Sequence, residues 1–159
     1  KEIGIECRED TLSGATFLPG IAIQKGSIVY DVQQMKFPGD LIHEAGHLAV
    51  MPPSMREGAD GENMQCDISP ASAEMAAIAW SWAALVHMQL PPKVLFHAEG
   101  YRGSSEHLAY MFSSEKYFGV PMLQWLGMTR EPKHDVTPDE QTYTNMIHWL
   151  RTENGRADQ

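Results

Sequence analysis

The amino-terminal part of the chain shows the pattern of a β-hairpin. Residues 21–24 (IAIQ) and 27–31 (SIVYD) are short runs rich in β-branched side chains, and Lys25-Gly26 separates them. A glycine-containing turn between two such runs predicts a pair of antiparallel strands. Residues 1–19 show no clear period, which predicts an irregular or extended lead-in.

A helical pattern follows the hairpin. Residues 37–40 (FPGD) introduce it, and Pro52-Pro53 ends it. His43 and His47 fall on the side opposite the main apolar stripe, so either they face solvent or a second element closes over them. The stripe consists of residues at helical spacing: Leu41, Ile42, Ala45, Leu48 and Ala49.

A second, more apolar helix is predicted after a polar connection over residues 54–67. Ser69 is suited to cap it, Pro70 suits its first turn, and Pro91-Pro92 stops it. Glu74 is the only formally charged residue between residues 68 and 92. A helix that is apolar on nearly every face is normally buried, so the sequence predicts a buried carboxylate that needs a partner.

Three further helices are predicted, over residues 104–116, 121–127 and 138–151. The last has the strongest signals, because Thr137 and Glu140 form a capping-box pattern and Pro138 suits the first turn. Residues 152–159 are polar and predict a frayed tail.

Composition narrows the class of protein. The net charge of -9 and the absence of a local basic patch argue against a nucleic-acid partner. The apolar stretch 71–90 approaches membrane-spanning length, but it is rich in alanine and contains Glu74, so we expect a buried helix and no membrane partner. Cys7 and Cys66 lack CxxC spacing and no signal peptide is recognised, which favours a cytoplasmic protein.

The first helix contains a pattern that carries chemistry, His43-Glu44-Ala45-Gly46-His47. Histidines four residues apart on a helix lie one above the other, so His43 and His47 can bind one metal ion. Glu44 is offset by one position. That offset suits a residue that stays off the metal and takes a proton from metal-bound water.

Glu74 is the candidate for a third ligand, because a Zn²⁺ ion would offset the cost of burying its carboxylate. The alternative is a carboxylate that stabilises the amino end of the helix or pairs with a Lys or Arg. Ala45 and Gly46 keep the first helix slim, which would let two backbones approach. Four other side chains are rival ligands: Asp67, His87, His97 and Glu99.

The stretch from residue 20 to residue 82 resembles the minimal gluzincin metallopeptidases of the ImmA/IrrE type. The hairpin, the HExxH helix and a Glu-x-x-Ala-x-x-aromatic segment, here Glu74, Ala77 and Trp80, carry the resemblance. It implies that His43, His47 and Glu74 bind zinc and that Glu44 is the catalytic base. The carboxyl-terminal third has no counterpart in the family, so substrate identity is not transferred.

The expected fold is α+β, with a small β-hairpin or sheet followed by a mainly helical metallopeptidase core. Residues 1–159 are expected to form a single zinc metallopeptidase-like domain, because this length suits one hydrophobic core. The sequence does not predict an oligomeric state.

Two features bear on the reaction. The hairpin could offer a strand edge to a peptide or protein substrate, although edge strands are commonly inert. Catalysis also needs a donor for the developing oxyanion, and Tyr101 and His97 are the first candidates around the turn that follows the second helix.

The resulting hypothesis is a zinc-dependent hydrolase, specifically a peptidase in which Glu44 activates water. Two alternatives stay open. A regulatory or sensor domain without turnover would have its fourth ligand position closed by Cys66 or His97. A hydrolase of non-peptide amides or esters would have a narrow, closed pocket.

Overall fold

β-branched residues build the sheet where the hairpin was predicted. In the computed structural model, which describes residues 3–61, 64–134 and 137–153, β2 (Ile21–Gln24) pairs antiparallel with β3 (Ser27–Tyr30). Lys25 and Gly26 join them with φ values of 48° and 72°. Two positive φ values in a two-residue connection are typical of a type I′ hairpin turn, whose twist matches that of the strands.

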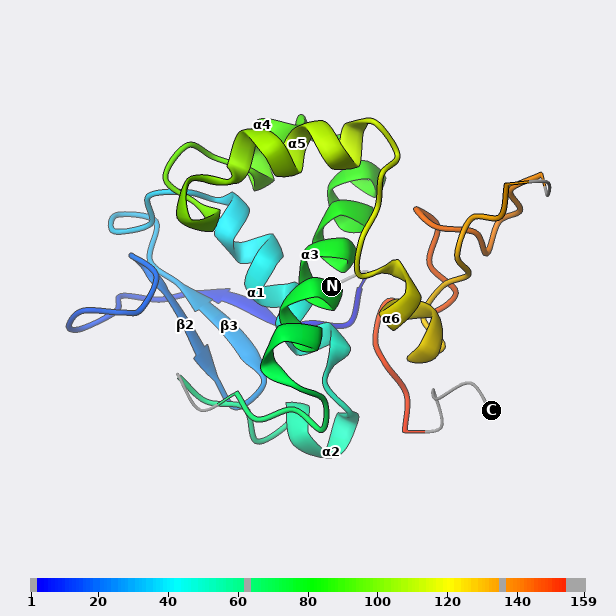
Figure 1. Ribbon diagram of the computed structural model, residues 1–159. Helices are drawn as coiled ribbons and strands as arrows, with labels where there is room; N and C mark the ends of the chain where they lie inside the picture. Colours follow the sequence, from blue (N-terminus) through cyan, green and yellow to red (C-terminus); the bar gives the residue numbers. More distant parts are fainter. Residues whose placement is uncertain (1–2, 62–63, 135–136, 154–159) are drawn as a thin grey trace.

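The lead-in contributes a third strand that was predicted only as irregular or extended. β1 (Cys7–Glu9) pairs parallel with β3, which gives the strand order β1-β3-β2. β2 is therefore an edge strand. The sheet lies on one side of the helices, beside α1 (Figure 1).

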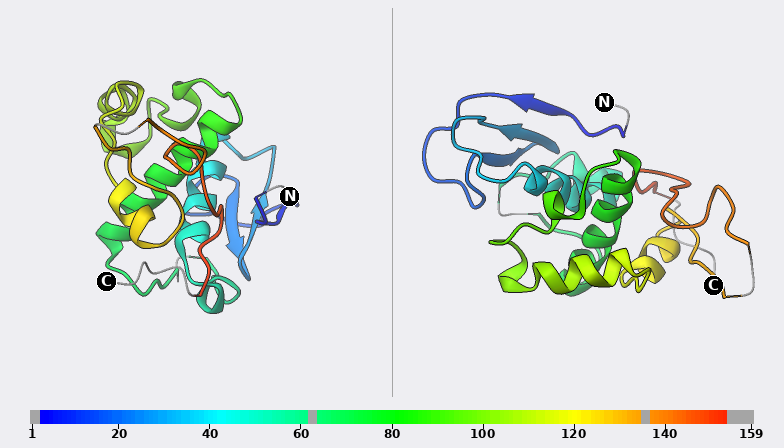
Figure 2. Two further views of the ribbon diagram at one scale, coloured as in Figure 1. Left: turned by 90° about the vertical axis from the view of Figure 1, so that its right-hand side faces the viewer. Right: turned by 90° about the horizontal axis from the view of Figure 1, so that it is seen from above.

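The two long helices agree with prediction. α1 (Gly39–Val50) ends just before Pro52-Pro53, and α3 (Pro70–His87) begins after Ser69, whose hydroxyl accepts a hydrogen bond from the Ser72 amide at 3.1 Å. The two helices pack closely on each other in the middle of the molecule, as Figure 2 shows from two sides.

Shorter elements surround this pair. Two four-residue helices, α2 (Pro53–Arg56) and α4 (Pro92–Leu95), follow the ends of α1 and α3. A 3-10 turn, η1 (Tyr101–Gly103), leads into α5 (Ser105–Ser113), and α6 (Val120–Trp125) packs on α3. α5 falls within its predicted range of 104–116, and α6 begins one residue before its predicted range of 121–127.

The helix predicted over residues 138–151 is wrong. Asp139 uses its carboxylate to accept hydrogen bonds from the Gln141 amide and the Thr142 hydroxyl, both at 2.9 Å. Tyr143 is buried and its hydroxyl donates to the Ala79 carbonyl of α3 at 2.8 Å. Local side-chain bonds and this long-range contact hold the segment in an irregular path, so the capping-box pattern does not start a helix.

The carboxyl-terminal segment is tied to the end of α1. Arg56 donates to the Leu48 and Met51 carbonyls at 2.8 and 2.7 Å and to the Arg151 carbonyl at 2.9 Å. Of the predicted frayed tail, Glu153 accepts a hydrogen bond from the Ser54 amide at 2.9 Å, and residues 154–159 lie outside the described part of the chain.

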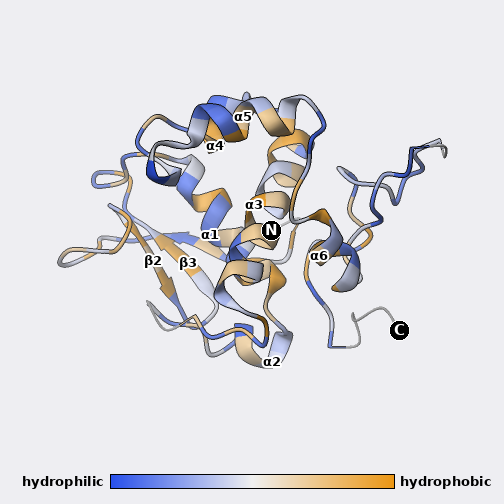
Figure 3. Ribbon diagram, viewed as in Figure 1, coloured by the Kyte–Doolittle hydropathy of each residue, from blue (hydrophilic) through white to orange (hydrophobic). Residues whose placement is uncertain are grey.

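One apolar core joins the sheet to the helices, so the α+β class is confirmed. Figure 3 shows hydrophobic residues in β2, β3 and stretches of α1 and α3. The largest fully buried side chains come from strands and helices alike and include Ile28, Leu48, Trp80, Leu85, Phe112 and Leu123.

Within residues 3–61, 64–134 and 137–153, no helix has the length and apolar character needed to cross a membrane.

Candidate metal centre

The three predicted ligands meet at one point between α1 and α3. His43 and His47 lie one helical turn apart, and their Nε2 atoms are 3.2 Å apart. Glu74 reaches them from the first turns of α3, with Oε1 at 3.6 Å from His43 Nε2 and Oε2 at 3.1 Å from His47 Nε2. Two imidazole nitrogens and a carboxylate therefore converge in a single cluster.

The spacing of these atoms fits a tetrahedral ion. At a zinc ion with bonds of about 2.0–2.1 Å, neighbouring ligand atoms lie about 3.3–3.4 Å apart. The separation of 3.2 Å between the two histidine Nε2 atoms is close to that value, and the Glu74 carboxylate presents a different oxygen to each histidine, at 3.6 and 3.1 Å. Two histidines and one carboxylate are also a donor set that zinc accepts in catalytic sites, where a fourth position stays open.

Close packing of the two helices makes the cluster possible. Gly46 lies against α3 so tightly that a Cβ atom there would be 2.7 Å from the Ala77 carbonyl oxygen and 2.8 Å from Ser81 Oγ. The Ser81 hydroxyl in turn lies 3.1 Å from the Ile42 carbonyl oxygen of α1. The prediction that small residues would let the backbones approach is confirmed at Gly46.

The pKa values of His43 and Glu74 are both shifted, and both shifts favour the deprotonated form that binds a metal ion. Burial, assisted by the neighbouring His47, lowers the pKa of His43 to about 4, against the opposing effect of Glu74. The hydrogen bond from His47 lowers the pKa of Glu74, while partial burial opposes that shift. Near pH 7 His43 is therefore neutral and Glu74 is ionised, and these are the forms that bind a metal ion.

The predicted reason for choosing Glu74 is wrong, although the residue joins the cluster. Its side chain is 47 % exposed, because it lies near the amino end of α3 where the helix emerges from the core. The carboxylate therefore does not need a metal to offset full burial. Its distances to the two histidines, and not its burial, make it a candidate ligand.

Glu44 lies beside the cluster without joining it. It is 9 % exposed and lines the same cleft as His43 and His47. Burial raises the pKa of Glu44, with His47 opposing and Asp40 and Glu74 adding to the shift. A carboxylate with a raised pKa in a cleft is suited to accept and return a proton.

Tyr101 contacts the cluster through His43. Its hydroxyl is 3.4 Å from Nδ1 of His43, the ring nitrogen that points away from His47 and Glu74. Burial raises the pKa of Tyr101, so the hydroxyl stays protonated. This placement suits a residue that orients His43, and it differs from the predicted role as an oxyanion donor.

His97 lies in the same cleft but away from the cluster. Its Nε2 is 2.9 Å from Asp40 Oδ1, and its ring stacks on Phe37 with centroids 3.8 Å apart. Its Nδ1 is buried without a hydrogen-bond partner among the described residues. Asp40 was not among the predicted site residues, although its position one turn before Glu44 on the same helix was a usable signal.

The other rival ligands have partners elsewhere. Asp67 binds the guanidinium of Arg151 at 2.6 and 2.8 Å, and Glu99 pairs with Lys36. His87 lies against Trp149. Cys7 and Cys66 are both free thiols. Among the described residues, only His43, His47 and Glu74 form a possible metal-binding group.

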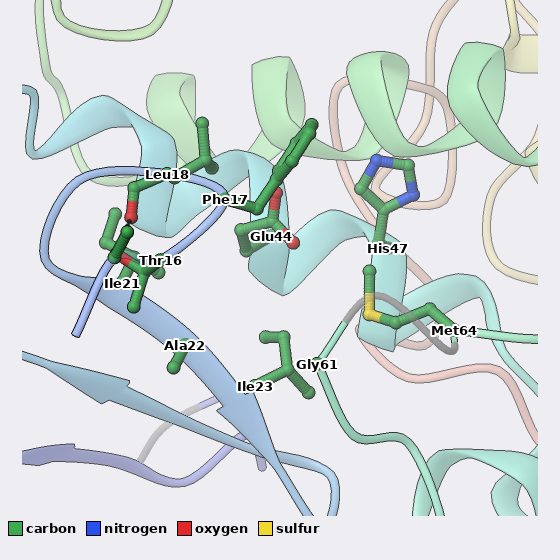
Figure 4. Close-up of a pocket in the computed structure, with 11 residues that line it drawn as sticks. Thr16, Phe17, Leu18, Ile21, Ala22, Ile23, Glu44, His47, Gly61 and Met64 are labelled. Atoms are coloured by element: carbon green, nitrogen blue, oxygen red, sulfur yellow. Dashed lines mark hydrogen bonds between the residues drawn. The ribbon is translucent and has the colours of Figure 1, made fainter. Parts of the chain in front are cut away.

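Two hollows meet at the cluster. The larger has a volume of ≈ 860 Å³ and is lined by the three cluster residues, Asp40, His97 and Tyr101, among others. The smaller, of ≈ 500 Å³, lies between Glu44 and His47 of α1 and the edge strand β2 (Figure 4). Phe17, Leu18, Glu44 and His47 line both, so the hollows adjoin on either side of Glu44 and His47.

No protein-family model, curated protein or solved structure matches the chain. The resemblance to the minimal gluzincins therefore stays a prediction, and function has to be inferred from the site itself.

Proposed function

We propose that the protein is a zinc-dependent hydrolase, specifically a metallopeptidase. The observation that carries this proposal is the convergence of His43 Nε2, His47 Nε2 and the Glu74 carboxylate at 3.1 to 3.6 Å, with Glu44 buried beside them. The described part of the chain supplies three ligands and no fourth, which favours an open catalytic site over a closed structural one.

Each side chain has a distinct task in this proposal. When bound, zinc would act as a Lewis acid and would lower the pKa of a coordinated water to about 7. His43 and His47 would each bind the ion through Nε2, and Tyr101 holds the His43 ring through Nδ1. Glu44 accepts the proton from water at its carboxylate and passes it to the leaving amine nitrogen.

The edge of β2 supports a peptide as substrate. Ile21 donates its amide to the Leu18 carbonyl, and the Ile23 carbonyl accepts from the Gly61 amide. In the pairing with β3, the backbone groups of Ile21 and Ile23 point away from β3, towards the outer edge of the sheet. Two of these groups, the Ile21 carbonyl and the Ile23 amide, have no hydrogen-bond partner among the described residues. An extended chain can pair with both groups.

The arrangement of the cleft also supports a chain as substrate. Each hollow, of ≈ 500 and ≈ 860 Å³, has the size of a small-molecule pocket. The two hollows adjoin at Glu44, so there is room for substrate on both sides of the reacting bond. A narrow closed pocket would instead have favoured a small amide or ester.

Hydrolysis of internally quenched peptides by the zinc-loaded protein tests the proposal, with zinc content measured alongside. We expect Glu44→Gln to keep its zinc and to lose about 100-fold or more in turnover, because a general base contributes about 10²–10⁴-fold. Glu106→Gln, at an exposed position on α5, is the matched control and should behave as wild type. Full activity of Glu44→Gln would overturn the mechanism.

A further inference from the structure

Phe17 is the most exposed large hydrophobic side chain among the described residues, at 82 %. It lies in the loop between β1 and β2 and lines both hollows beside Glu44 and His47 (Figure 4). An aromatic ring left in water next to a candidate active site is a feature typical of binding surfaces.

The loop that presents Phe17 is fixed by hydrogen bonds. The Thr16 hydroxyl donates to the Leu18 carbonyl and accepts from the Gly20 amide at 3.1 Å, and the Ile21 amide donates to the same Leu18 carbonyl at 3.1 Å. Gly20 has φ +72°, and a Cβ atom there would lie 2.3 Å from the Met35 amide nitrogen. The backbone of the loop that carries Phe17 is therefore held in place by the fold.

The smaller hollow beneath Phe17 has apolar walls. Glu44 and His47 are its only ionisable lining residues within the described chain. The walls come from the loop, from β2 and from the segment after residue 63: Ala15, Phe17, Leu18, Ile21, Ile23 and Met64.

We propose that this hollow is a side-chain subsite that selects peptides with a bulky apolar residue next to the reacting bond, and that Phe17 covers that residue. The inference rests on the proposed peptidase function. A peptide that pairs with the edge of β2 would bring its side chains into this hollow, within reach of Glu44. Apolar burial favours a phenylalanine or leucine, while moving a carboxylate from water to these apolar walls disfavours an acidic residue.

Equilibrium binding tests the subsite without turnover. The zinc-loaded Glu44→Gln protein is titrated calorimetrically with three blocked pentapeptides, each with four alanines around a central phenylalanine, alanine or glutamate. We expect the phenylalanine peptide to bind at least about 10-fold more tightly than the alanine peptide, since burying a large apolar side chain has that effect or more. The glutamate peptide should bind more weakly than the phenylalanine peptide, because the walls of the hollow are apolar.

Two variants and a matched control locate the effect. Adding Phe17→Ala should weaken binding of the phenylalanine peptide at least about 5-fold and leave that of the alanine peptide unchanged. Met64→Lys should reverse the order in favour of the glutamate peptide. Tyr110→Ala removes another exposed aromatic ring, on α5 and outside this hollow, and should change nothing.

The outcomes separate this inference from the peptidase proposal. Equal affinities for the phenylalanine and alanine peptides, no measurable binding of any peptide, or an equal effect of Tyr110→Ala and Phe17→Ala would overturn the subsite. If the phenylalanine preference is present but zinc-loaded wild type cleaves none of the peptides, the subsite stands and the peptidase proposal fails.

Discussion

At the scale of single residues, the candidate site depends on where each polar atom points. His43 directs Nε2 to His47 and Glu74 and directs Nδ1 to Tyr101, so both of its ring nitrogens have partners. Glu74 presents one oxygen to each histidine. An outer partner that fixes the orientation of a ligating ring is characteristic of working metal sites.

Removing the charge of Glu74 should greatly lower the affinity of the site for zinc. A glutamine keeps the size of the side chain but is a poor zinc ligand, so we expect Glu74→Gln to lower zinc affinity at least about 100-fold, beyond what loss of an outer partner costs. Competition with a chelating dye measures this. Glu99→Gln, which only breaks an exposed pair with Lys36, is the control. Unchanged affinity in Glu74→Gln would remove this residue from the site.

Loss of the Tyr101 hydroxyl should weaken zinc binding without abolishing it. Tyr101→Phe keeps the ring that packs on His43 and removes only the hydroxyl at 3.4 Å from Nδ1. We expect zinc affinity to fall about 10-fold, the lower end of the range for outer partners, because this contact is long. The same dye competition measures it, with Tyr110→Phe as control. An affinity within about twofold of wild type would contradict the role.

The three members of the cluster could be predicted from the sequence, but their surroundings could not. Spacing along one helix placed His43 and His47 together, and the lone charge of Glu74 drew attention to it. Its half-exposed state depends on how far the end of α3 extends past the core, which local pattern does not record. Phe17 showed no signal at all, because exposure of a loop residue is a property of the assembled fold.

At the scale of elements, the site depends on how closely α1 and α3 pack. Gly46 allows the contact, and its neighbours across the interface are Ala77 and Ser81. The sequence predicted both helices because each has a long periodic pattern with clear stop signals. It failed for residues 138–151, where Tyr143 is buried against α3 and Thr142 binds Asp139. Tertiary contacts override the local capping pattern in this segment.

Gly46→Ala should therefore be destabilising, although alanine favours helices. The added Cβ would meet a backbone oxygen at 2.7 Å. Overpacking of this kind costs about 1–3 kcal/mol, more than the gain of about 0.5–1 kcal/mol from helix propensity. Urea unfolding of the zinc-free protein measures the difference. Gly58→Ala, whose nearest contact would be 3.8 Å, is the control, and a Gly46→Ala protein more stable than wild type would refute the close packing.

At the scale of the whole molecule, the carboxyl-terminal segment connects the end of α1 to the segment just ahead of α3. Arg151 binds the Val50 carbonyl at the end of α1 and the carboxylate of Asp67 just ahead of α3. Arg56 draws the Arg151 carbonyl to the same place. The sequence could not predict this, because the contact of Arg151 with Asp67 spans 84 positions and depends on the irregular path of the chain.

Arg151→Ala should cost about 3 kcal/mol in the free energy of unfolding, the lower end of the range for breaking a buried ion pair, because Asp67 remains partly exposed. Chemical denaturation measures the loss. Arg130→Ala removes an exposed pair with Asp139 and should cost less than about 1 kcal/mol. Equal costs for the two variants would mean that the Arg151 contact does not hold the molecule together.

The zinc K-edge absorption spectrum of the protein loaded with one equivalent of zinc tests the metal centre most directly. We predict one zinc per chain, bound by nitrogen and oxygen ligands at about 2.0–2.1 Å, with the scattering pattern of two imidazoles. Failure to retain zinc, or a sulfur ligand at about 2.3 Å, would contradict a centre formed by His43, His47 and Glu74.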